Sequence, residues 1–168
     1  MIYSYPQLIF EYLVDNLQAT VRRYLMDEIN WNDRLIGITG ARGVGKTTFL
    51  LQYVKENYAS DDHTCLYINT NNFYIQHVGL PFFAGEFYHS GGKVILIDQV
   101  YKEPDWSKQI LECYERYPGL KIIFTGSSVM ELINEESVIK GIVKAYNLRG
   151  LSFREFFNLQ TGERIPAF

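Results

Sequence analysis

The chain has 168 residues, of which 47% are hydrophobic and 21% charged, and its formal net charge is −3. This length suits one globular domain with a sizeable core, and the composition excludes an intrinsically disordered chain. The slightly acidic balance gives no support for nucleic acid as a partner. No stretch approaches the roughly 18 apolar residues of a membrane span, and no basic segment precedes an apolar one at the N-terminus, so we expect a cytoplasmic protein that does not contact a membrane.

The first part of the chain predicts a helix. Apolar residues recur at helical spacing over residues 7–26, which favours one amphipathic helix with Arg22 and Arg23 on its later polar face. We assign residues 1–33 to an N-terminal helical segment and residues 34–168 to a nucleotide-binding domain, for the reasons that follow.

Residues 40–47 read GARGVGKT, a complete G-x-x-x-x-G-K-[ST] phosphate-binding loop between a strand-like run and a helix-like run. Its glycines allow backbone N–H groups to turn toward phosphate oxygens, and the dipole of the following helix favours an anion. Lys46 supplies the charge for the β- and γ-phosphates, and the Thr47 hydroxyl can ligate Mg²⁺. A glycine-rich turn with a surface lysine is the alternative. The predicted nucleotide-binding residues are Gly40, Arg42, Gly43, Val44, Gly45, Lys46, Thr47 and Thr48.

The rest of the chain alternates between strand-like and helix-like patterns. Beyond the loop and its flanking strand and helix, strands are predicted at 65–69, 93–98, 120–125 and 142–148, and helices at 79–90, 104–117, directly after Ser128, and 152–159. In the last helix, Ser152 and Glu155 have the spacing of a capping box. This alternation predicts an α/β fold with a parallel sheet and helices on both faces.

An acidic residue ends the clearest predicted strand, residues 93–98. Asp98 ends this strand, where a phosphate-binding loop needs a carboxylate to order Mg²⁺; a solvated strand-end aspartate is the alternative. Many ATPases place a glutamate next, to polarise the attacking water, but this chain has Gln99. An amide can hold a water molecule but cannot accept its proton. Glu103 is a candidate substitute.

Hydroxyl side chains end the strand that is expected to neighbour the Asp98 strand. A hydroxyl of Thr125, Ser127 or Ser128 in this place can position the γ-phosphate or the attacking water, and a polar turn capped by serine is equally compatible. We take Gln99, Thr125 and Ser127 as the candidates for the catalytic site.

Five segments of the chain carry a family pattern. They are 40–48, LYIN at 66–69, IDQV at 97–100, YPGLKIIFTGSS at 117–128 and LSFREF at 151–156. Together they resemble the prokaryotic AAA-like P-loop ATPases, whose longer members carry a C-terminal domain of unknown function. This resemblance implies a P-loop NTPase fold with an AAA-type sheet and the loop on a central strand, ATP and Mg²⁺ as ligands, and Thr125 near the sensor position.

The sequence departs from this family pattern at two positions. Gln99 stands where the family usually has glutamate, and Ile142 follows Gly141 where the family tends to have arginine. Each departure predicts weak hydrolysis. Gln99 removes the base, and loss of an arginine directed at the γ-phosphate slows other P-loop enzymes by roughly three powers of ten or more. Arg149 and Arg154 are the candidates to stand in for it.

Two main functions fit these patterns. The first is an AAA-type ATPase that couples Mg-ATP binding and slow hydrolysis to a conformational change in a protein partner or in a self-associated form. The second is a nucleotide-dependent switch that signals by binding alone. A small-molecule kinase ranks third, because no arginine-rich lid stretch occurs. The segment 161–168 reads like the start of a continuation, so we expect this chain to lack the family's further C-terminal domain.

Overall fold

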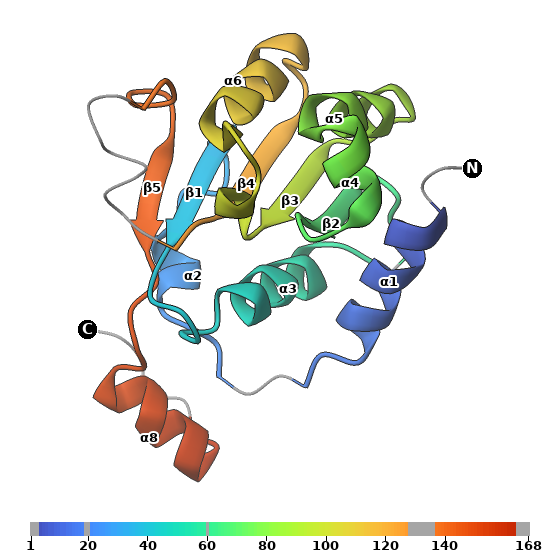
Figure 1. Cartoon of the computed structure of the whole chain (residues 1–168). Helices are drawn as coiled ribbons and strands as arrows, with labels where there is room; N and C mark the ends of the chain where they lie inside the picture. Colours follow the sequence, from blue (N-terminus) through green and yellow to red (C-terminus); the bar gives the residue numbers. More distant parts are fainter. Residues whose placement is uncertain (1–3, 19–20, 60, 128–136, 164–168) are drawn as a thin grey trace.

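The computed structural model describes residues 4–18, 21–59, 61–127 and 137–163. Within these residues, five parallel strands form one sheet in the order β2–β3–β4–β1–β5 (Figure 1). This confirms the predicted parallel α/β fold. The strands are β1 Leu35–Thr39, β2 Cys65–Asn69, β3 Val94–Asp98, β4 Lys121–Thr125 and β5 Lys144–Asn147.

The three central strands form the core of the sheet because their side chains are apolar on both faces. Every residue of β1 and of β3 is buried, as expected for strands that helices cover on two sides. In the register of the sheet, Ile36 of β1 lies opposite Ile123 of β4 on one side and Lys144 of β5 on the other. β5 is mostly exposed and closes one edge.

Helices cover both faces of the sheet, as predicted (Figure 1). α1 (Ser4–Asp15) and α3 (Lys46–Asn57) lie on one face, whereas α5 (Leu80–His89) and α6 (Trp106–Arg116) lie on the other. The remaining helical elements are α2 (Leu25–Glu28), α4 (Phe73–Val78), the 3-10 helix η1 (Val100–Lys102) and α8 (Phe153–Thr161).

The N-terminal ends of α8 and α4 show how local capping sets where a helix begins. The predicted capping box of α8 is present, with Ser152 accepting from the Glu155 N–H and Glu155 accepting from the Ser152 N–H. The sequence did not predict α4, which begins because Asn72 accepts hydrogen bonds from two backbone N–H groups, those of Tyr74 and Ile75. The helix predicted directly after Ser128 lies outside the described residues.

The prediction of one helix over residues 7–26 is wrong. α1 ends at Asp15, and α2 is a separate short helix that starts at Leu25. Between them the chain brings Arg23 into the interior, where the residue is only 8% exposed, so Arg23 does not lie on a solvated polar face. Its guanidinium bonds to the Arg149 carbonyl, 126 residues away in sequence, and helical periodicity carries no sign of such a contact.

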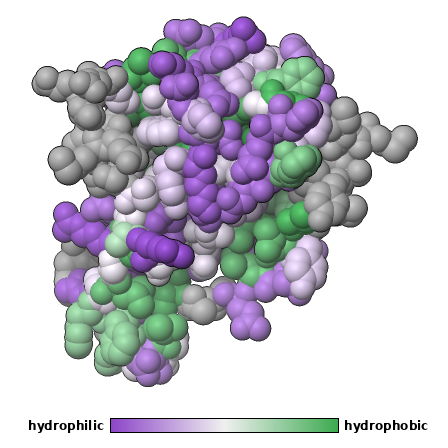
Figure 2. Space-filling view, viewed as in Figure 1, coloured by the Kyte–Doolittle hydropathy of each residue, from purple (hydrophilic) through white to green (hydrophobic). Residues whose placement is uncertain are grey.

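Apolar side chains also gather on the outside of α8. Phe153 is 80% exposed and Phe156 49%, and Leu151 and Leu159 are exposed as well. Figure 2 shows the corresponding hydrophobic patch at the lower left of the molecule, over α8. Contiguous exposed apolar surface of this kind is typical of a site of contact with another molecule.

Candidate functional site

The phosphate-binding loop connects β1 to α3 at the carboxyl edge of the sheet. Gly43 has φ 79° and Gly45 has φ 99°, and these left-handed conformations explain why glycine occupies both positions. The first hydrogen bond of α3 runs from the Phe49 N–H to the Gly45 carbonyl. The N–H groups of residues 46–48 therefore precede the helical ladder and are available to an anion.

Lys46 bends back over the loop that precedes it. Its ammonium donates to the carbonyl of Gly40 at 2.8 Å and to that of Ala41 at 2.9 Å. Burial lowers the pKa of Lys46, and the charge of Asp98 opposes this effect. Two charge-assisted contacts to carbonyl groups thus hold the lysine against the loop.

Asp98 is the centre of a hydroxyl network at the end of β3. The carboxylate is almost fully buried and accepts from Thr47 Oγ1 at 2.5 Å, from the Tyr67 hydroxyl at 2.9 Å, and from Thr125 Oγ1. These donors come from α3, β2 and β4. In the sheet, β2 and β4 flank β3, which ends at Asp98, and β4 separates β3 from the loop strand β1. Sequence reasoning missed Tyr67. Burial, followed by the charge of Asp98, raises the pKa of this tyrosine and keeps it a hydrogen-bond donor.

Gln99 has an unusual backbone conformation that two neighbouring segments support. It is in the left-handed region, with φ 59° and ψ 42°, which costs roughly 1 kcal/mol or more for a residue with a side chain. Its N–H donates to Thr125 Oγ1 at 2.9 Å, and its carbonyl accepts from Thr70 Oγ1 at 2.7 Å. These contacts fix the direction in which the Gln99 side chain leaves the sheet.

A cavity of about 460 Å³ lies between the loop and the Asp98–Gln99 turn. It brings together most of the predicted site residues, and it adds three that sequence reasoning had not placed there, Asn71, Tyr101 and Lys102. The residues that line it are Arg42, Gly43, Gly45, Lys46, Thr47, Asn71, Asp98, Gln99, Tyr101, Lys102 and Ser127. We call it the phosphate cavity. Thr125 does not line it, and reaches it only through Asp98 and Gln99.

The residues of the phosphate cavity fit a magnesium ion. The Thr47 hydroxyl and the Asp98 carboxylate adjoin each other and are the hard oxygen donors that Mg²⁺ prefers. Magnesium is usually bound through one or two carboxylates together with substrate phosphates, so it does not need a cage of protein ligands. In keeping with this, the described part of the chain has no cluster of three or more His, Cys, Asp or Glu side chains able to hold a metal ion.

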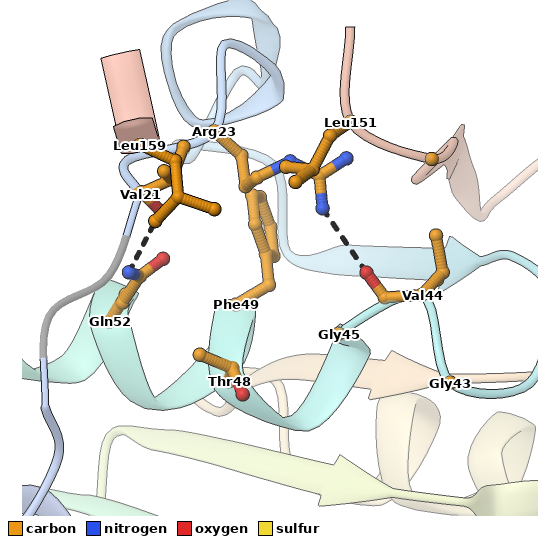
Figure 3. Close-up of a pocket in the computed structure, with 11 residues that line it drawn as sticks. Val21, Arg23, Gly43, Val44, Gly45, Thr48, Phe49, Gln52, Leu151 and Leu159 are labelled. Atoms are coloured by element: carbon orange, nitrogen blue, oxygen red, sulfur yellow. Dashed lines mark hydrogen bonds between the residues drawn. The ribbon is translucent and has the colours of Figure 1, made fainter. Parts of the chain in front are cut away.

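A second cavity of about 310 Å³ lies on the other side of the loop (Figure 3). It shares Gly43 and Gly45 with the phosphate cavity, and the predicted loop residues Val44 and Thr48 line this side only. We call it the inner cavity. Its lining residues are Val21, Arg23, Gly43, Val44, Gly45, Thr48, Phe49, Gln52, Gly150, Leu151 and Leu159.

Beside the inner cavity, Arg23 connects the loop to the segment that leads into α8. Its guanidinium donates to the Val44 carbonyl at 3.1 Å, to the Arg149 carbonyl, and to the Glu155 carboxylate at 3.1 Å. Burial tends to raise the pKa of Glu155, but hydrogen bonds from the Ser152 and Tyr24 N–H groups and the charge of Arg23 outweigh it, so the pKa lies below its ordinary value.

The residues predicted to substitute for the missing glutamate and arginine do not line the phosphate cavity. Glu103 is buried, burial raises its pKa, and it does not line the phosphate cavity. Arg149 and Arg154 do not line that cavity either, and Ile142 packs against the core. Within the described residues, the cationic side chains that line the phosphate cavity belong to Arg42, Lys46 and Lys102.

Most of the sequence matches a known protein family. Residues 32–157, about three quarters of the chain, match a family model described as an AAA domain. The chain belongs to this AAA family. The resemblance to AAA-like P-loop ATPases that the motifs indicated is thereby confirmed, and membership of this family supports a nucleotide-binding protein.

The chain was also compared with curated proteins and with solved structures. No curated protein shows significant similarity to the chain. A solved structure, that of C. elegans PCH-2, is similar with a TM-score of 0.44 and 20% sequence identity, over 86% of this chain and 40% of that one. The AAA domain described here thus spans about two fifths of PCH-2, and a likeness of this degree indicates neither a shared activity nor shared partners. Among the described residues, no helix is both long and apolar enough to cross a bilayer.

Proposed function

We propose that this AAA domain binds ATP with Mg²⁺ and uses the bound nucleotide to change its conformation. The observation that carries the proposal is the pair of cavities that share Gly43 and Gly45. One is lined by charged and hydroxyl groups suited to phosphates and a metal ion, and the other combines aliphatic and aromatic side chains with a few polar groups, which suits a nucleoside. A single extended ligand that crosses the loop fills both.

Each group at the phosphate cavity has a role in this proposal. The free N–H groups of residues 46–48 and the Lys46 ammonium bind the phosphates, and Lys46 exchanges its two loop carbonyls for phosphate oxygens. Thr47 and Asp98 hold Mg²⁺, which, when bound, neutralises charge on the phosphates. Thr125 and Tyr67 orient the Asp98 carboxylate through their hydroxyl groups.

A switch that works by binding alone is the second candidate function, because the phosphate cavity offers little to activate water. Asp98 is the only carboxylate among the described residues that line the phosphate cavity, and we assign it to the metal. Gln99 and Ser127 can orient a water molecule there but cannot accept its proton. We therefore propose slow turnover, with the nucleotide state carrying the signal.

A protein contact belongs to the same proposal. The exposed apolar residues of α8 support contact with a protein partner or with a second copy of the chain, and the net charge of −3 gives no support for nucleic acid. A cytoplasmic location, where ATP is abundant, is also part of the proposal.

Calorimetric titration of Mg-ATP into the chain, with phosphate release followed on the same sample, tests this function. We expect binding with slow release. Lys46→Ala is expected to weaken binding ten- to a hundredfold or more, because it removes charge-assisted contacts to phosphate. Lys108→Ala, which alters an exposed lysine of α6, is the matched control and is expected to bind as the unchanged chain does. Absence of ATP binding to the unchanged, folded chain would refute the proposal.

A further inference from the structure

Among the described residues that line the inner cavity, Gln52 alone has an amide side chain. It lies on α3 one helical turn beyond Thr48, on the same face of the helix, and only 6% of the residue is exposed. Its Nε2 donates to the Val21 carbonyl at 3.0 Å (Figure 3). A buried polar group of this kind has its hydrogen bonds satisfied within the fold, by ordered water or by a ligand.

The contact with Val21 fixes which way the amide faces. A backbone carbonyl only accepts hydrogen bonds, so the amide nitrogen must be the atom beside it, and Oε1 must be on the opposite side. Figure 3 shows Nε2 on the side of the Val21 carbonyl and Oε1 on the side of Phe49, which also lines the cavity. None of the hydrogen bonds of the described residues ends at this oxygen, and it is not one of the fully buried polar atoms that lack a partner. Gln52 thus presents a fixed amide acceptor to the inner cavity.

The other walls of the inner cavity suit a flat apolar ring. Val21, Phe49, Leu151 and Leu159 contribute aliphatic and aromatic carbon around the Gln52 amide. The cavity begins at the loop, so a base held here stays connected through its sugar to phosphates on the other side of Gly45. Purines have flat apolar faces, and they differ from one another at the ring edge in which positions donate and which accept.

We propose that Gln52 selects adenine by accepting a hydrogen bond from its 6-amino group through Oε1. This inference rests on the proposed function and adds to it the residue that sets the choice of base. Guanine and hypoxanthine carry a carbonyl oxygen at position 6, which places a second acceptor against Oε1. Because Val21 holds the amide, Gln52 cannot turn its nitrogen toward that carbonyl without losing its own bond.

Titration of ATP and of ITP into the unchanged chain, both with Mg²⁺, tests this selection, because inosine replaces the 6-amino group by a carbonyl. We expect ATP to bind at least about tenfold more tightly than ITP, the effect of one hydrogen bond lost and one acceptor left unpaired in a buried site. Purine riboside triphosphate, which has only hydrogen at position 6, is expected to bind more weakly than ATP. Equal affinity for ATP and ITP would overturn the role of Gln52 and leave the proposed function intact.

Gln52→Met keeps the length of the side chain and removes the acceptor. It is expected to weaken ATP about tenfold and ITP much less, so that the two bind within about threefold of each other. Gln160→Met, at an exposed glutamine of α8 that does not line the cavity, is the control and should keep the preference. An equal loss for both nucleotides in Gln52→Met would assign Gln52 a purely structural role and overturn the inference. If neither nucleotide binds the unchanged chain, the proposed function fails and this inference fails with it.

Discussion

Three hydroxyl groups converge on the buried carboxylate of Asp98, and together they fix where its oxygens point. Thr47 and Tyr67 bond to Oδ2 and Thr125 bonds to Oδ1. A buried carboxylate needs such partners, since an unpaired charge in the interior is strongly unfavourable. The same arrangement leaves Asp98 at the wall of the phosphate cavity with its orientation set before a ligand arrives.

Gln99 is the residue whose replacement most directly tests the chemistry. Its backbone is held by Thr70 and Thr125, so glutamate at this position projects into the same cavity. We expect Gln99→Glu to raise the rate of phosphate release at least tenfold, because a positioned general base typically contributes about a hundredfold or more. Steady-state phosphate release at saturating Mg-ATP measures this change.

Gln99→Ala is the control for that substitution, since it empties the position without adding a base, and it is expected to give no increase. An unchanged rate in Gln99→Glu would show that base loss is not what limits turnover. The absence of an arginine after Gly141, where Ile142 packs against the core, would then be the leading explanation.

At the residue scale, the sequence predicted the groups that local spacing determines. Lys46, Thr47 and Asp98 meet in one cavity because a motif and a strand end both lie at the carboxyl edge of the sheet. Tyr67 was not predicted, because its contact with Asp98 depends on how β2 pairs with β3. Gln52 was missed for a similar reason, since helical periodicity alone does not distinguish a buried glutamine from one in solvent.

Among the elements, α8 is tied to the rest of the molecule by the ion pair between Arg23 and Glu155. Glu155 also completes the capping box of α8 and accepts from the Tyr24 N–H. One carboxylate therefore joins the helix start, the segment before α2 and, through Arg23, the loop. Removing its charge disturbs all three contacts.

Glu155→Gln is expected to lower the free energy of unfolding by about 2 kcal/mol at pH 7, because the charge of Arg23 is left without its partner. The folded-state pKa of Glu155 lies below its ordinary value, so its charge stabilises the fold above the ordinary pKa of a glutamate. That contribution is lost as the pH falls through the folded-state pKa. The difference between Glu155→Gln and the unchanged chain should therefore be smaller in strongly acidic solution.

Urea denaturation at pH 7 and at successively lower pH measures this dependence. Glu112→Gln, which removes an exposed ion pair with Arg116 on α6, is the matched control and is expected to cost less than about 0.5 kcal/mol. If the cost of Glu155→Gln does not change with pH, the stabilisation by Glu155 does not depend on its charge.

The elements that the sequence predicted correctly have signals confined to a few adjacent residues. The buried strands are continuous apolar runs, and the start of α8 follows from Ser152 and Glu155. The break between α1 and α2 could not be predicted, because Arg23 leaves the helical path to reach carbonyl groups of the loop and of Arg149. Contacts between distant segments overrode the helical periodicity there.

For the whole molecule, ligand binding and stability are linked. A ligand that binds only the folded state, present at about a hundred times its dissociation constant, adds about 2.7 kcal/mol to stability. For a chain of this size, we expect Mg-ATP to raise the melting temperature by about 5–10 °C. Differential scanning fluorimetry with and without Mg-ATP measures the shift, and Lys46→Ala should show little of it. An equal shift in both proteins would place the binding outside the loop.

The bond between Arg23 and Glu155 joins residues 132 positions apart, and this has a consequence for the order of events during synthesis. A growing chain contains every residue of the phosphate cavity once Ser127 has been added. The inner cavity still lacks Leu151 and Leu159 at that stage, and Arg23 lacks its carboxylate. Such long-range contacts form late because they close large loops. Under the proposed function, the groups that bind phosphate are therefore complete before those that bind the nucleoside, and we expect tight ATP binding only once α8 has folded.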